Sequence, residues 1–212
     1  MARGCGADRV AGCAILILAA GASSRMRGGD KLLEQVAGQP ILRLMLERAL
    51  RVASGPVLCT LPAPDHPRMA CLEGLDVTPV MVPDAAEGMG ASIRAGVRAV
   101  PADCPAVMIL PGDMPELDKT DLRQMVQAHA AQPEAILRAT DKTGQHGHPV
   151  IFPADLFDDL RACHGDSGAR DLLRRHSQRV VTVPLPDLHA TTDLDTPEDW
   201  AAWRARPDRS QS

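Results

Sequence analysis

The sequence predicts one α/β domain, in which a mostly parallel, doubly wound sheet is covered by helices on both faces. Strand-like apolar runs alternate with stretches of helical period along the chain, which is the order that parallel strands with crossover helices require. The length of 212 residues is enough for one substantial core. No internal repeat or long linker divides the chain, so a single domain is expected.

Each element follows from a local pattern. The first strand is predicted at residues 14–18, where a continuous apolar run ends before Gly21, as in strands buried on both faces. Short apolar runs predict the other strands at residues 57–61, 77–82, 106–110, 135–139, 150–152 and 179–183. A helical period predicts helices at residues 40–52, 91–100, 118–131, 154–163 and 167–176. Thr196 as cap and Pro197 at the first helical position begin the last helix.

The domain is predicted at residues 13–205, between a flexible N-terminus at 1–12 and a flexible tail at 206–212. The first residues show no separate apolar stretch with a cleavage site, and the apolar run after them is far too short to span a bilayer. The six cysteines are scattered, with no Cys-x-x-Cys pair, which predicts free thiols and a cytoplasmic location. Cys59, Cys71 and Cys104 are expected to fill the core.

Charge and composition exclude two classes of partner. The formal net charge of -4 provides no general attraction to nucleic acid or to an anionic membrane. Aromatic residues are only 2% of the chain, and there is no Tyr, so stacking platforms for single-stranded nucleic acid are absent from the sequence. We therefore expect neither nucleic acid nor a membrane as a partner.

The loop after the first strand is the main candidate site. Ligands of open parallel sheets bind beyond the carboxyl ends of the strands, and this loop holds the small residues Ala19, Ala20 and Gly21. Small residues let the backbone approach phosphate oxygens closely, and Arg25 and Lys31 add two cations. Neither the Walker lysine spacing nor Gly-x-Gly-x-x-Gly is present, so a tight turn followed by a basic surface loop is the alternative.

Six motifs, in family order, cover residues 14–203 and together resemble the MobA-like nucleotidyltransferases, most closely the molybdenum cofactor cytidylyltransferases. The motifs are LAAGASSRM with DKLL at 18–33, GMGASIRAG at 88–96, LPGDMP at 110–115, GHPVIF at 147–152, GDSGAR at 165–170 and DLDTPED at 193–199. The resemblance implies a Rossmann-like fold of the nucleotide-diphospho-sugar transferase type. It departs at Arg27, where many members have glycine, and a solvent-exposed side chain is expected there.

The resemblance also implies a reaction, in which CMP passes from CTP to the phosphate of molybdenum–molybdopterin and pyrophosphate leaves. Positioning and charge neutralisation dominate such a transfer. Nucleotide contacts are expected from Leu18, Ala19, Ala20, Gly21, Arg25, Lys31 and Ser92. Catalytic roles fall to Arg25, Lys31 and Asp113.

Carboxylates of the later motifs are the expected ligands of Mg2+, which prefers oxygen and keeps several waters. Asp113 is the first, and Asp195 is favoured over Asp193 as the second. Asp113 could instead form a turn or cap a helix. Asp193 and Asp195 could instead serve only to begin the helix at Thr196.

The acceptor side of the site is expected to include His148, Pro149 and Arg170, by resemblance to the family motifs. Arg170 could instead be a surface residue of a helix, and Ser92 could cap the helix that follows it. His146 and His148 lie close in sequence, but no further zinc ligands follow them.

Three other functions compete with this prediction. An enzyme with the same fold and metal could use GTP in place of CTP, and Ala20 is the main residue that discriminates between them. It could also use another phosphorylated acceptor. The chain could also be a chaperone that binds the finished cofactor and delivers it to a molybdenum hydroxylase. Intact Arg25, Lys31 and Asp113 argue against a purely binding role.

Overall fold

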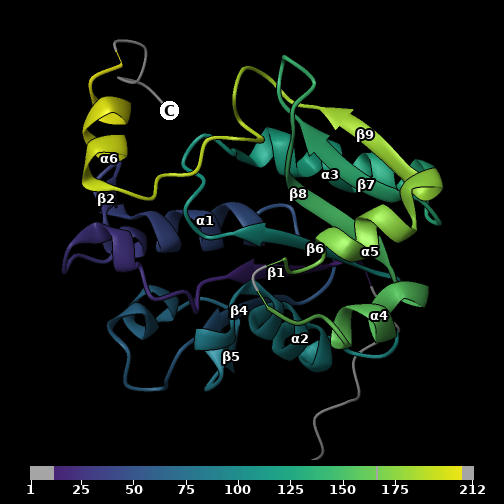
Figure 1. Cartoon of the computed structure of the whole chain (residues 1–212), viewed down its shortest axis with the longest axis horizontal. Helices are drawn as coiled ribbons and strands as arrows, with labels where there is room; N and C mark the ends of the chain where they lie inside the picture. Colours follow the sequence, from purple (N-terminus) through teal and green to yellow (C-terminus); the bar gives the residue numbers. More distant parts are fainter. Residues whose placement is uncertain (1–11, 166, 207–212) are drawn as a thin grey trace, which may run out of the picture.

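The computed structural model describes residues 12–165 and 167–206, and a seven-stranded sheet forms its centre (Figure 1). The strands are β1 (Ala14–Leu18), β4 (Val57–Leu61), β5 (Thr78–Met81), β6 (Ala106–Pro111), β7 (Ile136–Thr140), β8 (His146–Pro153) and β9 (Val180–Pro184). Their order across the sheet is β5-β4-β1-β6-β8-β7-β9. Only β8 runs antiparallel to its two neighbours, and the other pairs are parallel. The predicted mostly parallel sheet is therefore confirmed.

Helices cover both faces of this sheet. They are α1 (Ile41–Leu50), α2 (Met89–Ala99), α3 (Lys119–Ala131), α4 (Phe157–Arg161), α5 (Arg170–Arg175) and α6 (Pro197–Arg204). Residues of α1, α3 and α6 share one core with one face of β1, and residues of α2, α4 and α5 share a second core with its other face. Figure 1 shows α1 and α2 on opposite sides of β1. This two-sided burial explains why β1 is a continuous apolar run.

Two α-helices are shorter than the sequence pattern predicts. Residues 154–156 form a 3-10 turn, η5 (Ala154–Leu156), and α4 begins only at Phe157. At Leu156 the backbone reaches ψ 4°, away from α-helical geometry, which explains the break. Gly168 has φ +53°, a left-handed conformation that interrupts the predicted helix at 167–176, so α5 starts at Arg170.

Several short elements have no periodic signal. A two-stranded hairpin joins β2 (Gln35–Val36) to β3 (Gln39–Pro40). The 3-10 helices are η1 (Ser24–Met26), η2 (Lys31–Leu33), η3 (Pro67–Leu72), η4 (Ala85–Glu87) and η6 (Ser177–Arg179). Strand β8 begins at His146, four residues before the predicted strand, because the turn before it is held by the Asp141 carboxylate, which accepts from the Thr143 and Gln145 N–H groups.

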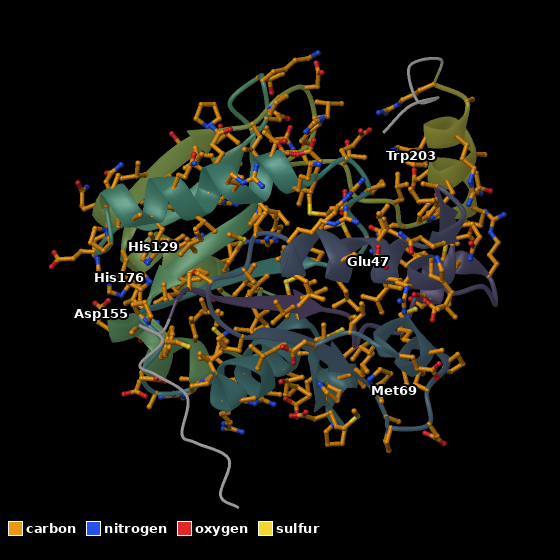
Figure 2. All side chains as sticks on the ribbon, turned by 180° about the vertical axis from the view of Figure 1, so that it is seen from behind. Glu47, Met69, His129, Asp155, His176 and Trp203 are labelled. Carbon is orange, nitrogen blue, oxygen red and sulfur yellow. The ribbon has the colours of Figure 1, made fainter. Side chains whose placement is uncertain are left out.

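The start of the last helix, α6, agrees with the pattern of the sequence. Thr196 caps α6 as predicted, because its hydroxyl accepts from the Asp199 N–H and the Asp199 carboxylate accepts from the Thr196 N–H. The predicted flexible segments lie outside the described residues, apart from Gly12 and Arg206. Figure 2 shows Trp203 of α6 and His129 of α3 toward opposite ends of the molecule.

The described cysteines are all free thiols. Cys59, Cys71 and Cys104 are buried and free, as expected, and so are Cys13 and Cys163. In residues 12–165 and 167–206 no helix has the length and apolar character needed to cross a bilayer.

Candidate functional site

One buried arginine, Arg68 of η3, holds the loop after β1 in place through hydrogen bonds. Its Nε and one terminal nitrogen donate to the two carboxylate oxygens of Asp30 at 2.7 and 2.8 Å. The other terminal nitrogen donates to the carbonyls of Ala19 and Gly21 at 2.6 and 2.7 Å, and the Ser23 hydroxyl accepts a fifth bond at 2.9 Å. The Arg68 side chain is only 2% exposed, so this network is shielded from water.

Arg68 also fixes the direction of the loop peptides. The C=O and the following N–H of a trans peptide point in opposite directions. Because the Ala19 and Gly21 carbonyls face Arg68, the N–H groups of Ala20 and Ala22 face away from it. The loop therefore presents backbone donors on the side opposite its anchor, the arrangement that binds phosphate oxygens.

The second part of the site is a cluster of charges that includes Lys31, Asp113 and Asp195. The Lys31 ammonium lies 2.5 Å from an Asp113 oxygen and 2.7 Å from an Asp195 oxygen, and Arg25 contacts the other oxygen of Asp195 at 2.8 Å. Lys31 comes from η2, Asp113 follows β6, and Asp195 precedes α6, so three separate segments meet here. The predicted catalytic residues Arg25, Lys31 and Asp113 thus lie together.

Burial and pairing act in opposite directions on Lys31. Its side chain is 19% exposed, and burial alone would lower the pKa of the ammonium. The negative charges and hydrogen bonds of Asp113 and Asp195 outweigh burial and raise that pKa above its ordinary value. Lys31 is therefore a fixed positive charge at neutral pH.

Asp193 lies near this cluster but forms no hydrogen bond with it among the described residues. Burial, followed by the negative charges of Asp195 and Asp113, raises the pKa of Asp193. Within the described ranges, no group of three or more His, Cys, Asp or Glu side chains is placed to hold a metal ion. The three predicted carboxylates therefore do not converge on one point, whereas Asp113 and Asp195 converge on Lys31.

Helix α2 approaches the loop at Ala20. The buried side chains of Ala20, Val82 and Ala91 form a small apolar cluster, which brings the first turn of α2 beside the loop. Ser92 follows Ala91 and is buried, but it does not cap the helix, because Gly88 occupies that position and α2 begins at Met89. The alternative role of Ser92 as an N-cap is thus wrong.

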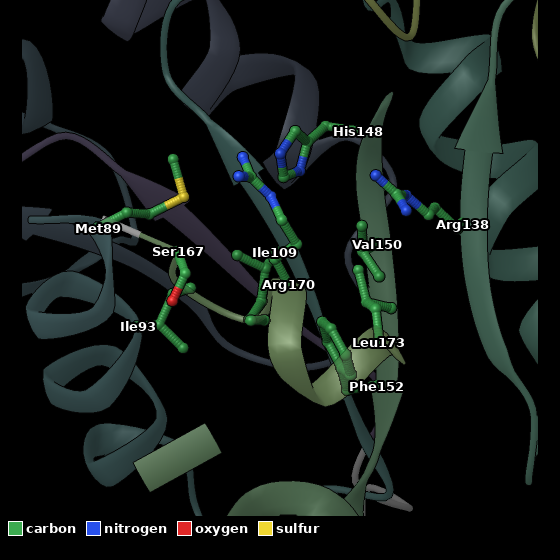
Figure 3. Close-up of a pocket in the computed structure, with 11 residues that line it drawn as sticks. Met89, Ile93, Ile109, Arg138, His148, Val150, Phe152, Ser167, Arg170 and Leu173 are labelled. Atoms are coloured by element: carbon green, nitrogen blue, oxygen red, sulfur yellow. The ribbon is translucent and has the colours of Figure 1, made fainter. Parts of the chain in front are cut away.

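A cavity of about 120 Å3 lies on the other side of α2 (Figure 3). Its polar lining comes from Arg138 of β7, His148 of β8, and Ser167 and Arg170 at the start of α5. The apolar lining is Met89, Ile93, Ile109, Val150, Phe152, Ala169 and Leu173. The predicted acceptor residues His148 and Arg170 therefore share one cavity. Pro149 follows His148 on β8 and does not line the cavity.

His148 is held in this cavity without a charge. Burial, with a smaller contribution from the Arg138 charge, lowers the pKa of its imidazole to about 4, although the Ile109 backbone and the Asp113 charge act in the opposite direction. Its Nδ1 is buried and has no hydrogen-bond partner within residues 12–165 and 167–206. Gly147 allows the close approach of the chain behind it, because a Cβ there would meet the Ala190 carbonyl, which accepts the His148 N–H at 2.9 Å.

Arg27 lies on the surface, as predicted. Its side chain is 72% exposed and contacts Glu198 at 2.8 Å. The backbone at Arg27 has φ +51°, a left-handed conformation that glycine adopts at less cost.

Two site residues carry no signal in the sequence. Arg68 is 38 positions from its partner Asp30, and Arg138 lies in the middle of an apolar strand. A charged residue inside such a strand is the only local feature that could have directed attention to Arg138.

A glycine-containing loop at the carboxyl end of β1, with paired cations and carboxylates beside it, defines a nucleotide-binding α/β domain. The chain belongs to the family of the MobA-like NTP transferase domain, whose model matches residues 15–180. It is thus a nucleotidyltransferase of the MobA-like type.

Two curated relatives show different degrees of coverage. A molybdenum cofactor guanylyltransferase of Bradyrhizobium sp. (strain ORS 278) is 31% identical over 194 residues, which are 88% of this chain and 89% of that protein. The bifunctional protein GlmU of Leifsonia xyli subsp. xyli is 33% identical over 122 residues, which are 56% of this chain. The match covers only 25% of GlmU.

A solved structure is similar over nearly the whole chain. Rv0371c from Mycobacterium tuberculosis H37Rv superimposes with a TM-score of 0.77 at 26% identity, covering 92% of this chain and 98% of that one. The same protein in complex with manganese superimposes with a TM-score of 0.68 at 25% identity, covering 90% and 96%.

Proposed function

We propose that this protein transfers CMP from CTP to the phosphate of molybdenum–molybdopterin, giving the cytosine dinucleotide form of the cofactor and pyrophosphate. The observation that carries the proposal is the meeting of Lys31, Asp113 and Asp195 beside a loop whose N–H groups face away from Arg68. This arrangement supplies the cations, carboxylates and backbone donors that nucleotidyl transfer needs.

In this reaction an oxygen of the acceptor phosphate forms a bond to the α-phosphorus, and the bond from that phosphorus to the bridging oxygen of pyrophosphate breaks. The acceptor is already an anion, so no residue has to remove a proton from it. Lys31 and Arg25 neutralise the negative charge on the triphosphate and on the departing pyrophosphate, and the loop N–H groups orient the phosphates.

A divalent cation fits the donor set of this site. Two carboxylates, from Asp113 and Asp195, already converge on a single positive charge, and magnesium is commonly bound by one or two carboxylates plus waters. These residues would hold the ion, which when bound supplies neutralisation of the negative charge on the transferred phosphoryl group. The manganese complex of Rv0371c supports a divalent ion in a relative.

The choice of base rests on Ala20. Its methyl group is buried against Val82 and Ala91, where the first turn of α2 meets the loop. We propose that Ala20, together with Ser92 on that turn, favours the smaller pyrimidine of CTP. The curated relatives named molybdenum cofactor guanylyltransferases support GTP as the alternative.

The competing role is a chaperone that binds the finished cofactor and delivers it to a molybdenum hydroxylase. Such a protein has no need of a lysine between two carboxylates, which is the feature that favours an enzyme. Delivery as a second task is compatible with transfer.

A triphosphate panel tests the proposal. Purified protein is incubated with Mg2+, a molybdopterin acceptor and each of the four ribonucleoside triphosphates, and pyrophosphate release is measured. CTP is expected to give the fastest release, and Ala20→Gly is expected to narrow the gap between CTP and GTP. A wild-type preference for GTP would overturn the base assignment and leave the reaction class intact.

The metal assignment has its own test. Asp113→Asn is expected to lower pyrophosphate release by about a hundredfold or more, because the variant loses a carboxylate that would hold the charge-neutralising ion. Asp103→Asn is the matched control, since Asp103 is exposed and precedes the same strand at its opposite end. Equal rates in the two variants, or full turnover in excess EDTA, would show that Asp113 holds no essential ion.

A further inference from the structure

The cavity beside α5 is lined by two arginines, Arg138 and Arg170, and by no carboxylate among the described residues. Figure 3 shows the His148 ring between the guanidinium groups of these two arginines, at the same end of the cavity. Among the described residues neither arginine forms a salt bridge, and burial, followed by the positive charge of Arg170, lowers the pKa of Arg138. Like charges held together in a cavity are unfavourable unless an anion joins them.

Two buried polar atoms at this position have no hydrogen-bond partner among the described residues. They are Nε of Arg138 and Nδ1 of His148. One terminal nitrogen of Arg138 lies 3.1 Å from the His146 ring, which is neutral or positive and does not balance the arginine charge. Buried groups of this kind are normally hydrogen-bonded, so these two atoms are placed to bind polar atoms of a ligand.

The geometry points to a phosphate monoester dianion held between Arg138 and Arg170, with the ring system of the acceptor on the apolar floor. A phosphate monoester carries about -1.5 to -2 charge near pH 7, which matches two guanidinium groups. One planar guanidinium group can donate two parallel hydrogen bonds to phosphate oxygens. Two arginines on separate elements can therefore bind the same phosphate. The floor of Ile109, Val150 and Phe152 offers apolar contact to an attached ring.

The position of the cavity suits a phosphate that reacts. His148 lies within electrostatic reach of Arg138 on one side and of Asp113 on the other, so the cavity adjoins the charged cluster around Lys31. This inference rests on the proposed transfer to a phosphorylated acceptor and deepens it: Arg138 is assigned as a specificity residue that selects acceptors carrying a phosphate monoester.

Binding of a simple aryl phosphate tests the inference without the natural acceptor. Phenyl phosphate is titrated into the full chain by calorimetry, and the same titration is repeated with Arg138→Met, Arg170→Met and the control Arg123→Met. Arg123 is exposed on α3 and does not line the cavity. Loss of either cavity arginine is expected to weaken the affinity about tenfold or more, with a smaller effect at high salt, while the control stays within about twofold.

Two further measurements distinguish a misfolded variant from a failure of the anion site or of the proposed reaction. Arg138→Met is checked by thermal melting, and if it does not fold, Arg170→Met decides, because that side chain is exposed and its loss leaves no buried charge. Normal phenyl phosphate binding by both variants would overturn the inference, even if pyrophosphate release from CTP proceeds. Weakened binding in a protein that releases no pyrophosphate from any triphosphate would support the anion site and refute the proposed reaction.

Discussion

Replacing Arg68 by methionine is predicted to destabilise the protein and to weaken triphosphate binding together. Arg68 makes five hydrogen bonds to Asp30, Ser23 and the carbonyls of Ala19 and Gly21, and its side chain is 2% exposed. Methionine keeps much of the volume but removes every donor. The Asp30 carboxylate and both carbonyls then lose their main partner, and the peptides of the loop are free to turn.

The size of the effect follows from these contacts. Removing one partner of a buried ion pair costs about 3–5 kcal/mol. Asp30 keeps bonds from the Leu32 N–H at 3.0 Å and the Ser23 hydroxyl at 3.1 Å, so the lower end, about 3 kcal/mol, is expected. For a chain of this length, that corresponds to a fall in Tm of roughly 6–12 °C.

The control is Arg43→Met. Arg43 reaches the end of η3, where it donates to the Glu73 carbonyl at 3.0 Å, but its side chain is 30% exposed. Arg43 also forms an ion pair with Glu47 at 3.2 Å, and a partly exposed pair of this kind contributes about 1 kcal/mol or less, so the melting temperature should change little. If Arg68→Met melts within about 2 °C of Arg43→Met and binds CTP normally, the loop-anchoring role of Arg68 is refuted.

The pH dependence gives a second check on the same pair. Burial would raise the pKa of Asp30, but the hydrogen bonds and charge of Arg68 outweigh it and hold the pKa below its ordinary value of 3.8. A carboxyl with a lowered folded-state pKa contributes stability above its unfolded-state pKa and loses that contribution as the pH falls through the folded-state value. The stability gap between wild type and Arg68→Met should therefore shrink below about pH 4.

Three other changes test separate parts of the structure. Lys31→Ala is expected to slow pyrophosphate release by about a hundredfold or more, whereas the exposed Arg27→Ala should stay within about threefold; similar rates would remove Lys31 from the site. Gly147→Ala should displace His148, because its Cβ would meet the Ala190 carbonyl, and should raise the KM for the acceptor more than that for CTP; an unchanged acceptor KM would contradict this. Burial lowers the pKa of His129, whose Nδ1 has no hydrogen-bond partner among the described residues. The wild-type protein should therefore lose stability as the pH falls below 6.5. The Tm of His129→Leu should depend less on pH between pH 7 and 5. Parallel melting curves for wild type and His129→Leu would refute the last assignment.

The sequence predicts most of the fold because the sheet is buried on both faces. Strand β1 is recognisable as a continuous apolar run, and α6 is recognisable from Thr196 and Pro197, since both signals are local. The shortened α4 and α5 were not predictable from periodicity, because a 3-10 turn at Leu156 and the left-handed Gly168 depend on how the chain meets its neighbours.

Some residues of the site were also predictable from the sequence, and others were not. Family motifs are the reason that Lys31, Asp113 and Asp195 were expected together, and the structure places all three in contact. Arg68 and Arg138 were missed, because their roles depend on partners brought close by folding, and no spacing in the sequence encodes such a contact.

One isotope experiment tests the central claim, which is that the site around Lys31 and Asp113 transfers a nucleotidyl group. The protein is incubated with Mg2+ and a molybdopterin acceptor, with CTP labelled either at the α-phosphate or at the γ-phosphate. Nucleotidyl transfer predicts that the α label moves to the acceptor and the γ label is released in pyrophosphate, in equal amounts. Appearance of the γ label on the acceptor, or recovery of intact CTP in both samples, would contradict the account.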